Sequence, residues 1–381
     1  MTDGCNFRCN YCSVGDPEHI NVIDNMYIKR FIDGMQELLD YKKDNYLDIL
    51  WHGGEPLLIH KQIYEDLISY VHRKLPNVNI KFTIQTNGSL INEEWIEFFK
   101  KYDIRPGISL DGYRELHNAN RVDEDGNGTY DIVMKNIELL RKHSIDPGVL
   151  MVLNTQYQID TDKLYDFLKN NKLNAKVHAV FPAGRASNRK DMDMVFKNYV
   201  DVLIELYRNL IKDDIDIVID PIYSLLNSII NEKDLPECSY SGRCGHDFMC
   251  LYQDGSVSFC GRNDNTKELL YGNINEQTPL QLYTSAQAER LRNRMDELKR
   301  GSCGECGYFN LCHGGCPFES LLNTGVIESK YRHCCEWKRL LDFMYIEGLD
   351  LFREFLVKKK KAINSDIEEK HELLKEYLEN A

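Results

Sequence analysis

The sequence predicts an α/β fold in which parallel strands alternate with covering helices. Apolar runs typical of β-strands alternate with helical patterns through the first half of the 381-residue chain. Polar and glycine-containing turns follow directly after these apolar runs, at the strand ends where such folds place their active sites. This pattern implies an open sheet or a barrel.

The elements follow one another in a regular order. Strands are predicted at residues 47–51, 80–84, 107–110, 149–153 and 177–181. Helices are predicted at residues 61–74, 92–102 and 130–142. The stretch between Gly112 and the helix at 130–142 is predicted as a loop.

The pattern changes twice in the second half of the chain. Residues 191–232 are mainly helical with an interruption at 215–219, and beyond Leu235 the chain becomes rich in Cys and Gly. Asp254-Gly255 between apolar residues predicts a β-hairpin. A helix is predicted at 336–361 and a final amphipathic helix after Ser365. These changes place a domain boundary near residue 233.

Composition disfavours several classes of partner. The net charge is −13, with 47 basic and 60 acidic residues, which disfavours binding to nucleic acid or to an anionic membrane surface. The sequence has no run near the roughly 20 apolar residues of a membrane span and no signal-peptide core. We therefore expect a cytoplasmic protein. An odd total of 13 cysteines in that reducing compartment favours metal ligation over disulfides.

The cysteines gather at the two ends of the chain. Cys5, Cys9 and Cys12 lie within eight residues of one another, a spacing that can hold a four-iron cluster while one iron keeps an open position. A second series contains a Cys-x2-Cys pair, which also occurs in zinc sites, so zinc is the alternative for this series. The series comprises Cys303, Cys306, Cys312 and Cys316, with further cysteines on both sides.

The N-terminal Cys-x3-Cys-x2-Cys motif resembles that of the radical S-adenosylmethionine (SAM) enzymes. Three strand-end motifs at the expected places strengthen the resemblance: Gly53-Gly54-Glu55-Pro56, Thr86-Asn87-Gly88, and Ser109 to Gly112 followed by Arg121. The later cysteines resemble the SPASM extension. The resemblance implies a partial (β/α) TIM-like barrel over 1–232, a Cys-rich SPASM domain over 233–340, and C-terminal helices over 341–381.

The resemblance also implies the cofactors. Cys5, Cys9 and Cys12 would hold the reactive cluster, with Tyr11 beside the adenine of SAM. Gly53, Gly54 and Glu55 would hold the methionine ammonium, and the remaining implied SAM contacts are Ser109, Arg121, Thr86 and Asn87. With two auxiliary clusters, the enzyme would carry three [4Fe-4S] clusters.

The family spacing divides the later cysteines into two sets of four. Cys238, Cys244, Cys260 and Cys316 would hold one auxiliary cluster. Cys303, Cys306, Cys312 and Cys334 would hold the other. Cys335 is an alternative to Cys334, and Cys250 is expected to be a small buried apolar residue. Fully ligated clusters of this kind suit electron transfer.

The leading functional hypothesis from sequence is a peptide maturase that forms a thioether or carbon–carbon crosslink. The alternatives are an anaerobic sulfatase-maturating enzyme and, from another class, a non-catalytic iron–sulfur or zinc scaffold. Sulfatase-maturating relatives usually carry an aspartate base directly after the cysteine that matches Cys260, whereas this chain has Gly261. No general base can be assigned from the sequence.

The expected partners are a peptide or protein substrate and an electron donor of the flavodoxin or ferredoxin type. Only four residues precede Cys5, where family members normally have a first barrel strand. We therefore expect that a separate leader-binding protein, or the barrel rim, recognises the substrate.

Overall fold

The computed structural model describes residues 1–14, 21–155, 158–187, 189–213, 217–262, 269–301 and 303–363. The chain folds into two compact units. One contains Met1–Leu150, Phe181–Arg189 and Arg243–Arg294. The other contains Met151–Val180, Lys190–Gly242 and Met295–Ala381. Both units combine segments from either side of residue 233, and the division at 232 and 340 stays a prediction.

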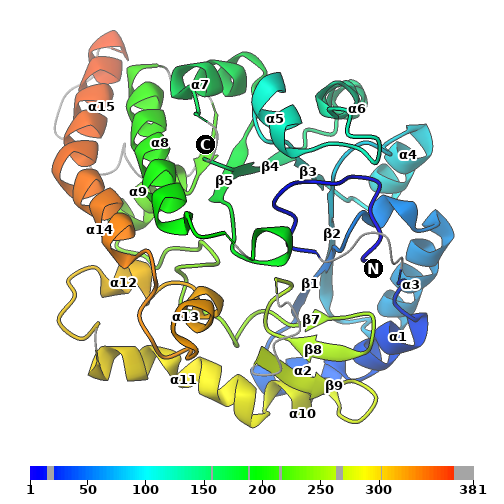
Figure 1. Cartoon of the computed structure of the whole chain (residues 1–381). Helices are drawn as coiled ribbons and strands as arrows, with labels where there is room; N and C mark the ends of the chain where they lie inside the picture. Colours follow the sequence, from blue (N-terminus) through cyan, green and yellow to red (C-terminus); the bar gives the residue numbers. More distant parts are fainter. Residues whose placement is uncertain are drawn as a thin grey trace. The chain divides into compact units, whose positions relative to one another are not determined.

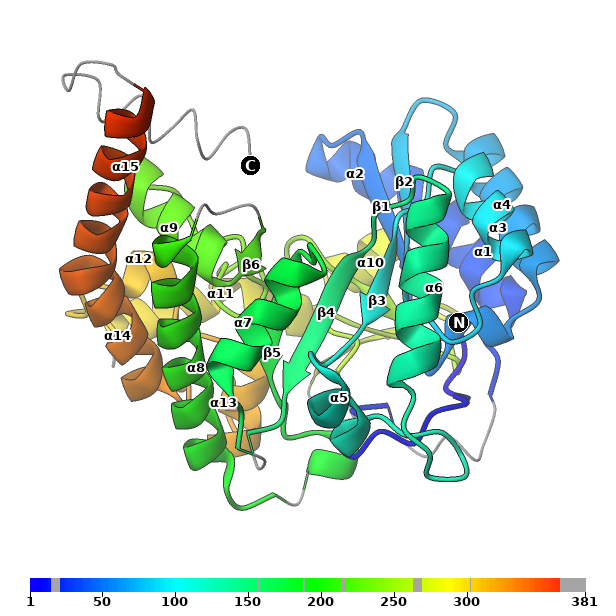
Figure 2. The same cartoon turned by 90° about the horizontal axis from the view of Figure 1, so that it is seen from above.

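A six-stranded sheet runs in sequence order from β1 to β6 (Figures 1 and 2). The registered pairs β1/β2, β2/β3, β3/β4 and β5/β6 are all parallel. This confirms the predicted α/β class and its open, partial-barrel order. The strands are β1 (Tyr46–Trp51), β2 (Asn79–Thr86), β3 (Pro106–Ser109), β4 (Gly148–Leu153), β5 (Ala175–Ala179) and β6 (Ile219–Asp220).

The first three strands end close together, which places the predicted motifs at one edge of the sheet. Trp51 at the end of β1 pairs with Ile84 of β2, and Thr86 at the end of β2 pairs with Ile108 of β3. The turns that begin at His52, Asn87 and Leu110 therefore leave the sheet side by side.

Amphipathic helices cover these strands in the first unit. Helix α3 begins where the His60 side chain caps the N–H of Gln62, and it buries Tyr64 against Trp51 of β1 (ring centroids 4.8 Å apart). Tyr64 also contacts Trp95 of α4. Helices of this unit are α1 (Asn25–Asp33), α2 (Met35–Lys42), α3 (Lys61–Lys74), α4 (Glu93–Lys101), α5 (Arg114–Asn120), α6 (Tyr130–Lys142) and α10 (Pro279–Tyr283), with short helices η1 (Pro56–Leu58) and η2 (Gly184–Ala186).

The structure corrects one sequence prediction directly. The stretch after Gly112, predicted as a loop, contains helix α5. The helix is not apparent from the sequence because its seven residues are too few to show a periodic apolar stripe. Its Leu116, His117 and Asn120 are nevertheless buried.

The hairpin predicted around Asp254-Gly255 is confirmed. Strand β7 (Cys250–Leu251) pairs antiparallel with β8 (Ser256–Ser258), and β8 pairs with β9 (Leu270–Asn273). The Asp254 carboxylate accepts from the N–H of Ser256 at 2.9 Å, which is a turn contact. Asp264, the other carboxylate near Cys260, lies outside the described residues.

The second unit is mainly helical. Its long helix α8 (Met192–Lys212) packs against α7 (Thr161–Asn170) and α14 (Cys334–Phe343). The helix predicted at 336–361 is observed as α14, the π-helical segment η4 (Met344–Gly348) and α15 (Leu349–Ile363) in succession. The unit also contains α9 (Ile222–Asn231), α12 (Phe309–Cys312) and α13 (Pro317–Thr324), while α11 (Ala286–Arg300) and β4 contribute residues to both units.

The helix predicted after Ser365 lies outside the described residues. Within the described chain, every helix is too short or too polar to span a membrane. The expected cytoplasmic location stays a prediction.

Candidate functional site

The segment before Cys5 lies directly on the turn that follows β1. The N–H of Gly54 donates to Thr2 O at 2.6 Å, and the N–H of Glu55 donates to Gly4 O at 2.8 Å. A Cβ at Gly53 would lie 2.1 Å from Thr2 O, and one at Gly54 would lie 2.2 Å from Gly4 O. The two glycines therefore allow the backbone carrying Cys5 to approach the sheet edge.

The middle of the cysteine loop lies along the segment that follows helix α5. The N–H of Arg8 donates to Val122 O at 2.7 Å, and the N–H of Asn10 donates to Asn120 O at 2.9 Å. Together with the contacts at Gly54, these bonds tie one short loop to the turn after β1 and to the end of helix α5. The cysteines are thus held on the rigid sheet edge.

The short helix η2 covers the last part of the loop. The backbone N–H of Arg185 donates to Cys12 O at 2.9 Å, and its Nη1 donates to Cys9 O at 3.2 Å. Gly184 has φ +54°, and a Cβ there would lie 2.3 Å from Cys12 O. This contact was not predicted from the sequence, in which its one signal is the Ala183-Gly184 turn after the fifth strand.

The partial burial of the cysteine triplet, with Cys9 buried and Cys5 and Cys12 half-buried, fits an iron–sulfur cluster. Desolvation raises the pKa of Cys5 to about 11 and that of Cys9 to about 12, and both thiols also repel Cys12. Three adjacent thiolates are unfavourable here unless a cation compensates them, which the irons of a cluster would do. No group of three His, Cys, Asp or Glu side chains in the described chain is arranged around a single metal ion. A four-iron cluster instead places each thiolate on a different iron.

The carboxylate of Glu55 braces two strand-end turns. It is fully buried and accepts from Thr86 Oγ1 at 2.7 Å, from the N–H of Asn87 at 2.7 Å and from the N–H of Leu57 at 2.8 Å. The implied contact between Glu55 and the methionine ammonium stays a prediction. The observed partners of the carboxylate are protein groups.

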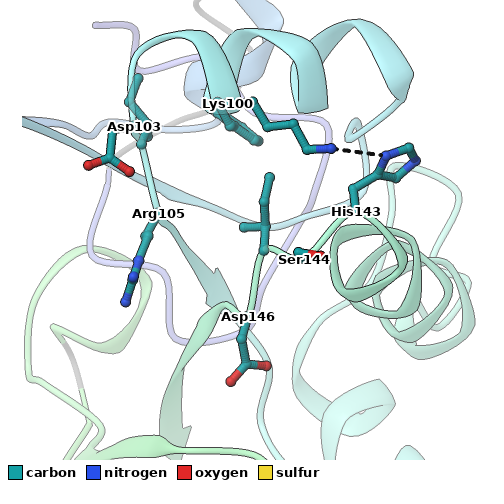
Figure 3. A pocket seen from close by; sticks show the side chains of 9 residues that line it. Lys100, Asp103, Arg105, His143, Ser144 and Asp146 are labelled. Atoms are coloured by element: carbon teal, nitrogen blue, oxygen red, sulfur yellow. Dashed lines mark hydrogen bonds between the residues drawn. The ribbon is translucent and has the colours of Figure 1, made fainter.

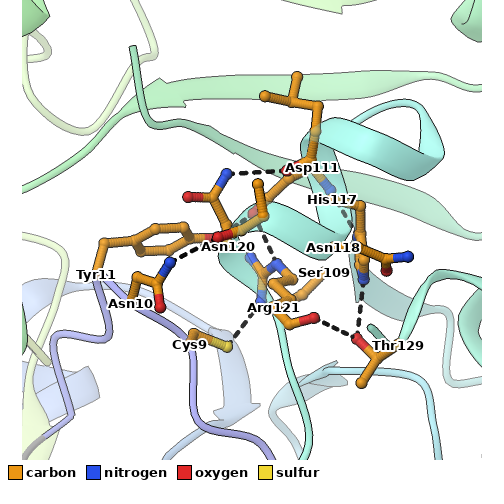
Figure 4. A network of polar contacts seen from close by, with 12 residues as sticks. Cys9, Asn10, Tyr11, Ser109, Asp111, His117, Asn118, Asn120, Arg121 and Thr129 are labelled. Carbon is orange, nitrogen blue, oxygen red and sulfur yellow. Dashed lines mark hydrogen bonds and ion pairs between the residues drawn. The ribbon is translucent and has the colours of Figure 1, made fainter. Parts of the chain in front are cut away.

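A buried polar network lies beneath the cysteine loop (Figure 4). The Tyr11 hydroxyl donates to the carboxylate of Asp111, and Arg121 Nε lies 3.0 Å from Asp111 Oδ2. Burial opposes the charge of Arg121, but Asp111 raises the pKa of the guanidinium above its usual value, so it stays ionised. The Arg121 guanidinium also covers the Tyr11 ring, 5.5 Å from its centroid. The sequence motif contained Asp111 but gave no sign of this ion pair.

A chain of hydrogen bonds extends the network to Thr129. The N–H of Asp111 donates to His117 Nδ1 at 3.2 Å, so in neutral His117 the Nε2 carries the proton and donates to Thr129 Oγ1 at 3.0 Å. Thr129 Oγ1 donates to Arg121 O at 3.0 Å. Desolvation lowers the pKa of His117 to about 3, which keeps the ring neutral. Because His117 and Asn120 are fully buried, they support the site from beneath.

The structure brings the predicted SAM-contact residues to one edge of the first unit. Ser109 ends β3 and accepts from Gln85 Nε2 at 3.0 Å, and its side chain is almost buried. The side chain of Asn87 donates to Cys5 Sγ at 3.9 Å and to Asn6 Oδ1 at 2.8 Å. The roles of these residues toward SAM stay predictions. The residues gathered here are Cys5, Cys9, Tyr11, Cys12, Gly53, Gly54, Glu55, Thr86, Asn87, Ser109 and Arg121.

The second predicted auxiliary set comes together within the second unit. Burial raises the pKa of Cys312 to about 12 and also raises the pKa of Cys334. Cys303 and Cys306 lie close enough to Cys334 to raise the pKa of its thiol electrostatically. Cys303, Cys306 and Cys334 do the same to Cys312. Cys335 is exposed. The observed grouping therefore favours Cys334 over Cys335 as the fourth thiol.

The first predicted auxiliary set has members in both units. Cys244 and Cys260 both lie near Tyr271 in the first unit, and Cys250, which is only partly buried, lies near Cys260. Cys238 and Cys316 belong to the second unit. Ligation of one cluster by Cys238, Cys244, Cys260 and Cys316 stays a prediction.

A separate cavity of about 410 Å³ opens at the opposite edge of the sheet (Figure 3). Arg105 on its wall comes directly before β3, and Asp146 lies two residues before β4. The cysteine loop lies instead beyond the carboxyl ends of the strands. Lys100 Nζ and His143 Nδ1 lie 3.4 Å apart on the same wall. This cavity is not part of the cysteine site.

Comparison with known proteins agrees with this geometry. Residues 1–168 match the model of the Radical SAM superfamily. The chain is 29% identical over 329 residues to a cysteine-type anaerobic sulfatase-maturating enzyme of Clostridium novyi, covering 83% of this chain and 85% of the relative. It is 27% identical over 327 residues to a serine-type enzyme of Klebsiella aerogenes, covering 82% and 77%.

The fold is shared with solved structures. Native anSMEcpe with bound AdoMet has a TM-score of 0.75 and 22% identity, covering 93% of this chain and 96% of that one. The same protein with AdoMet and the Kp18Cys peptide has a TM-score of 0.73 at the same identity and coverage. At this identity the likeness establishes the fold.

Proposed function

This chain is a member of the radical SAM superfamily, and on that premise we propose that it oxidises a residue of a peptide or protein substrate. In the proposal, Cys5, Cys9 and Cys12 hold the cluster to which SAM binds. When bound, the cluster would supply the electron that splits SAM, and the resulting 5′-deoxyadenosyl radical would abstract hydrogen from the substrate. The observation that carries the proposal is the anchoring of the cysteine loop to the turn after β1 and to the end of helix α5.

The residues of the site support this use in three ways. Gly53 and Gly54 let the loop approach the sheet edge, and Glu55 fixes the turn after β2 relative to the turn after β1. Helix η2 covers the loop from the other side through Arg185. Such a rigid, covered site restricts water around a reactive radical.

We propose a cysteinyl or seryl residue of a sulfatase as the oxidised group. The alignments of this chain with a cysteine-type and a serine-type sulfatase-maturating enzyme each cover more than three quarters of the relative's length. They favour this reading over the peptide crosslinking that the sequence motifs alone put first. A solved neighbour that binds a peptide together with AdoMet supports a peptide segment as substrate.

Peptide crosslinking stays as a second candidate because of one residue. Gly261 directly follows Cys260, where the resemblance implies an aspartate base in sulfatase-maturating enzymes. An external flavodoxin- or ferredoxin-type donor is also part of the proposal, since it would reduce the SAM-binding cluster. The two auxiliary clusters would accept the further electron that oxidation of the substrate radical releases. A separate leader-binding protein belongs to the crosslinking candidate.

The test uses the anaerobically reconstituted full chain with SAM and a reductant. Formation of 5′-deoxyadenosine is expected, and Cys9→Ala should abolish it while the later cysteines still bind iron. Unchanged SAM cleavage by Cys9→Ala, or an iron-free wild-type protein, would reject the proposal.

Candidate peptides then separate the two functions. A seryl sulfatase peptide should lose two hydrogens and gain an aldehyde that reacts with a hydrazine probe. A crosslinked peptide also loses two hydrogens but gives no aldehyde. If crosslinks form and sulfatase peptides stay unmodified, the second candidate is correct.

A further inference from the structure

The guanidinium of Arg121 lies beside the sulfur of Cys9. Its Nη1 donates to Cys9 Sγ at 4.0 Å, a long contact that is within the range of hydrogen bonds to sulfur. The Arg121 side chain is only 9% exposed and that of Asp111 is fully buried. A full positive charge is thus held in a largely dry environment next to one thiol of the triplet.

Two other groups hold Arg121 in this place. Asp111 Oδ2 pairs with its Nε at 3.0 Å, and the same carboxylate receives the Tyr11 hydroxyl. The Tyr11 ring lies against the face of the guanidinium. Since Tyr11 directly precedes Cys12 in sequence, the network is built into the cysteine loop itself (Figure 4).

A second thiol has its own nitrogen donors. Asn87 Nδ2 donates to Cys5 Sγ at 3.9 Å, and the backbone N–H of Phe7 donates to the same sulfur at 3.3 Å. Asn87 is held by two hydrogen bonds: its backbone N–H donates to Glu55, and its side-chain amide donates to Asn6. Two thiols of the triplet therefore receive N–H groups from side chains fixed by other contacts.

We propose that Arg121 and Asn87 donate hydrogen bonds to the ligating sulfurs and thereby set the reduction potential of the SAM-binding cluster. Asp111 acts as a positioning residue for Arg121. Hydrogen bonds to the sulfurs and local net charge are known determinants of cluster potential. The inference rests on the proposed cluster at Cys5, Cys9 and Cys12 but on no choice of substrate.

The charges predict opposite effects for two substitutions. Reduction adds one negative charge to the cluster, so the cation of Arg121 stabilises the reduced form. Arg121→Gln should make the potential more negative. Asp111→Asn removes a negative charge but keeps a side-chain oxygen that can accept from Arg121 Nε, so Arg121 stays in place and the potential should become more positive. A purely structural role would not produce shifts of opposite sign.

The potential is measured on the reconstituted full chain without SAM by redox titration with electron paramagnetic resonance. The signal of a variant with Cys5, Cys9 and Cys12 all changed to Ala is subtracted, so that only the N-terminal cluster is followed. For Arg121→Gln we expect the ratio of reduced to oxidised cluster at a fixed solution potential to fall roughly tenfold, about 59 mV for one electron. For Asp111→Asn the ratio should rise.

Matched controls come from an exposed ion pair in the same unit. Arg114 and Asp131 are 52% and 69% exposed, and Arg114→Gln and Asp131→Asn make the same charge changes in solvent. Both should leave the potential unchanged. Arg121→Lys keeps the charge and should shift the potential in the same direction as Arg121→Gln but by less, so it carries the test should the Gln variant bind no iron.

The inference is overturned if Arg121→Lys, Arg121→Gln and Asp111→Asn all retain the wild-type potential. Loss of SAM affinity in Arg121→Gln at an unchanged potential would instead identify Arg121 as a SAM ligand. Absence of iron from the wild-type protein would reject the proposed function rather than this inference alone.

Discussion

The carboxylate of Glu55 accepts a hydrogen bond from the backbone N–H of Asn87 at 2.7 Å and so joins the turn after β1 to the turn after β2. Its other partners, Thr86 Oγ1 and the N–H of Leu57, are also donors. Desolvation is the largest influence on this group and raises the pKa of Glu55 from 4.5 to about 7, against the effect of these donors. The brace is therefore sensitive to pH in the neutral range.

Glu55→Gln should remove a pH dependence of stability. Because the folded-state pKa of Glu55 lies above the unfolded value, the folded protein holds the proton more tightly, and the free energy of unfolding falls as pH rises through about 7. The stabilisation is fully present below about pH 4.5, and its loss amounts to about 3 kcal/mol. Gln cannot titrate, so the variant should lack this slope whatever its overall stability.

Denaturant unfolding of both proteins between pH 4.5 and 8 measures this difference. Glu94→Gln is the control, because the Glu94 side chain is 79% exposed and its variant should follow the wild-type curve. Parallel curves for wild type and Glu55→Gln would contradict the raised pKa.

Thr129→Val should destabilise the network below the cysteine loop. The hydroxyl of Thr129 accepts from His117 Nε2 and donates to Arg121 O, so an isosteric valine leaves a buried donor and a buried acceptor without partners. The expected cost in unfolding free energy is about 2 kcal/mol. Thr129→Ser keeps the hydroxyl and should lose clearly less. Equal stability of the two variants, measured by denaturant unfolding, would show that the hydrogen bonds contribute nothing.

Gly184→Ala should disturb the cover over the cysteine loop. A Cβ at Gly184 would lie 2.3 Å from Cys12 O, in addition to the strain of φ +54°. The expected result is a lower iron content after reconstitution, because the Cys12 backbone must move. Gly126 has φ +84° and open space where a Cβ would lie. Gly126→Ala is therefore the control, because it introduces the backbone strain of a positive φ without a steric clash. Equal iron contents of the two variants would remove the special role of Gly184.

Local sequence signals predicted the strands and long helices well, because their patterns are set by burial on one face. Helix α3 has the predicted bounds, and the turns carrying Glu55, Asn87 and Ser109 meet at the strand ends as expected. The parallel order follows from the strand–helix alternation alone. These are properties that short stretches of sequence determine by themselves.

Contacts between residues distant in sequence could not be predicted from the sequence. The network of Tyr11, Asp111 and Arg121 joins residues about one hundred positions apart, and nothing in their local sequences marks the pairing. The contact of Arg185 with Cys9 is likewise set by how the strand ends converge. Helix α5 was missed because its buried side includes His117 and Asn120, which a search for apolar periodicity does not count.

Gly261→Asp tests whether a missing carboxylate limits oxidation of a sulfatase peptide. The Cβ that Gly261 lacks would lie 3.6 Å from Cys250 Sγ, an ordinary contact distance, so the position accepts a side chain. The neighbouring Arg262 lies over the Phe181 ring, 4.7 Å from its centroid. We expect Gly261→Asp to fold and bind iron as the wild type does.

The added carboxylate should take up the proton released as the substrate is oxidised, and should raise the aldehyde formed per 5′-deoxyadenosine several-fold. Gly261→Asn is the matched control, since it has nearly the same size and no basic oxygen. Aldehyde yields are measured by hydrazine labelling and mass spectrometry of cysteinyl and seryl peptides. Equal yields for the Asp and Asn variants would show that another group accepts the proton, and that Gly261 does not argue against the sulfatase-maturating reading.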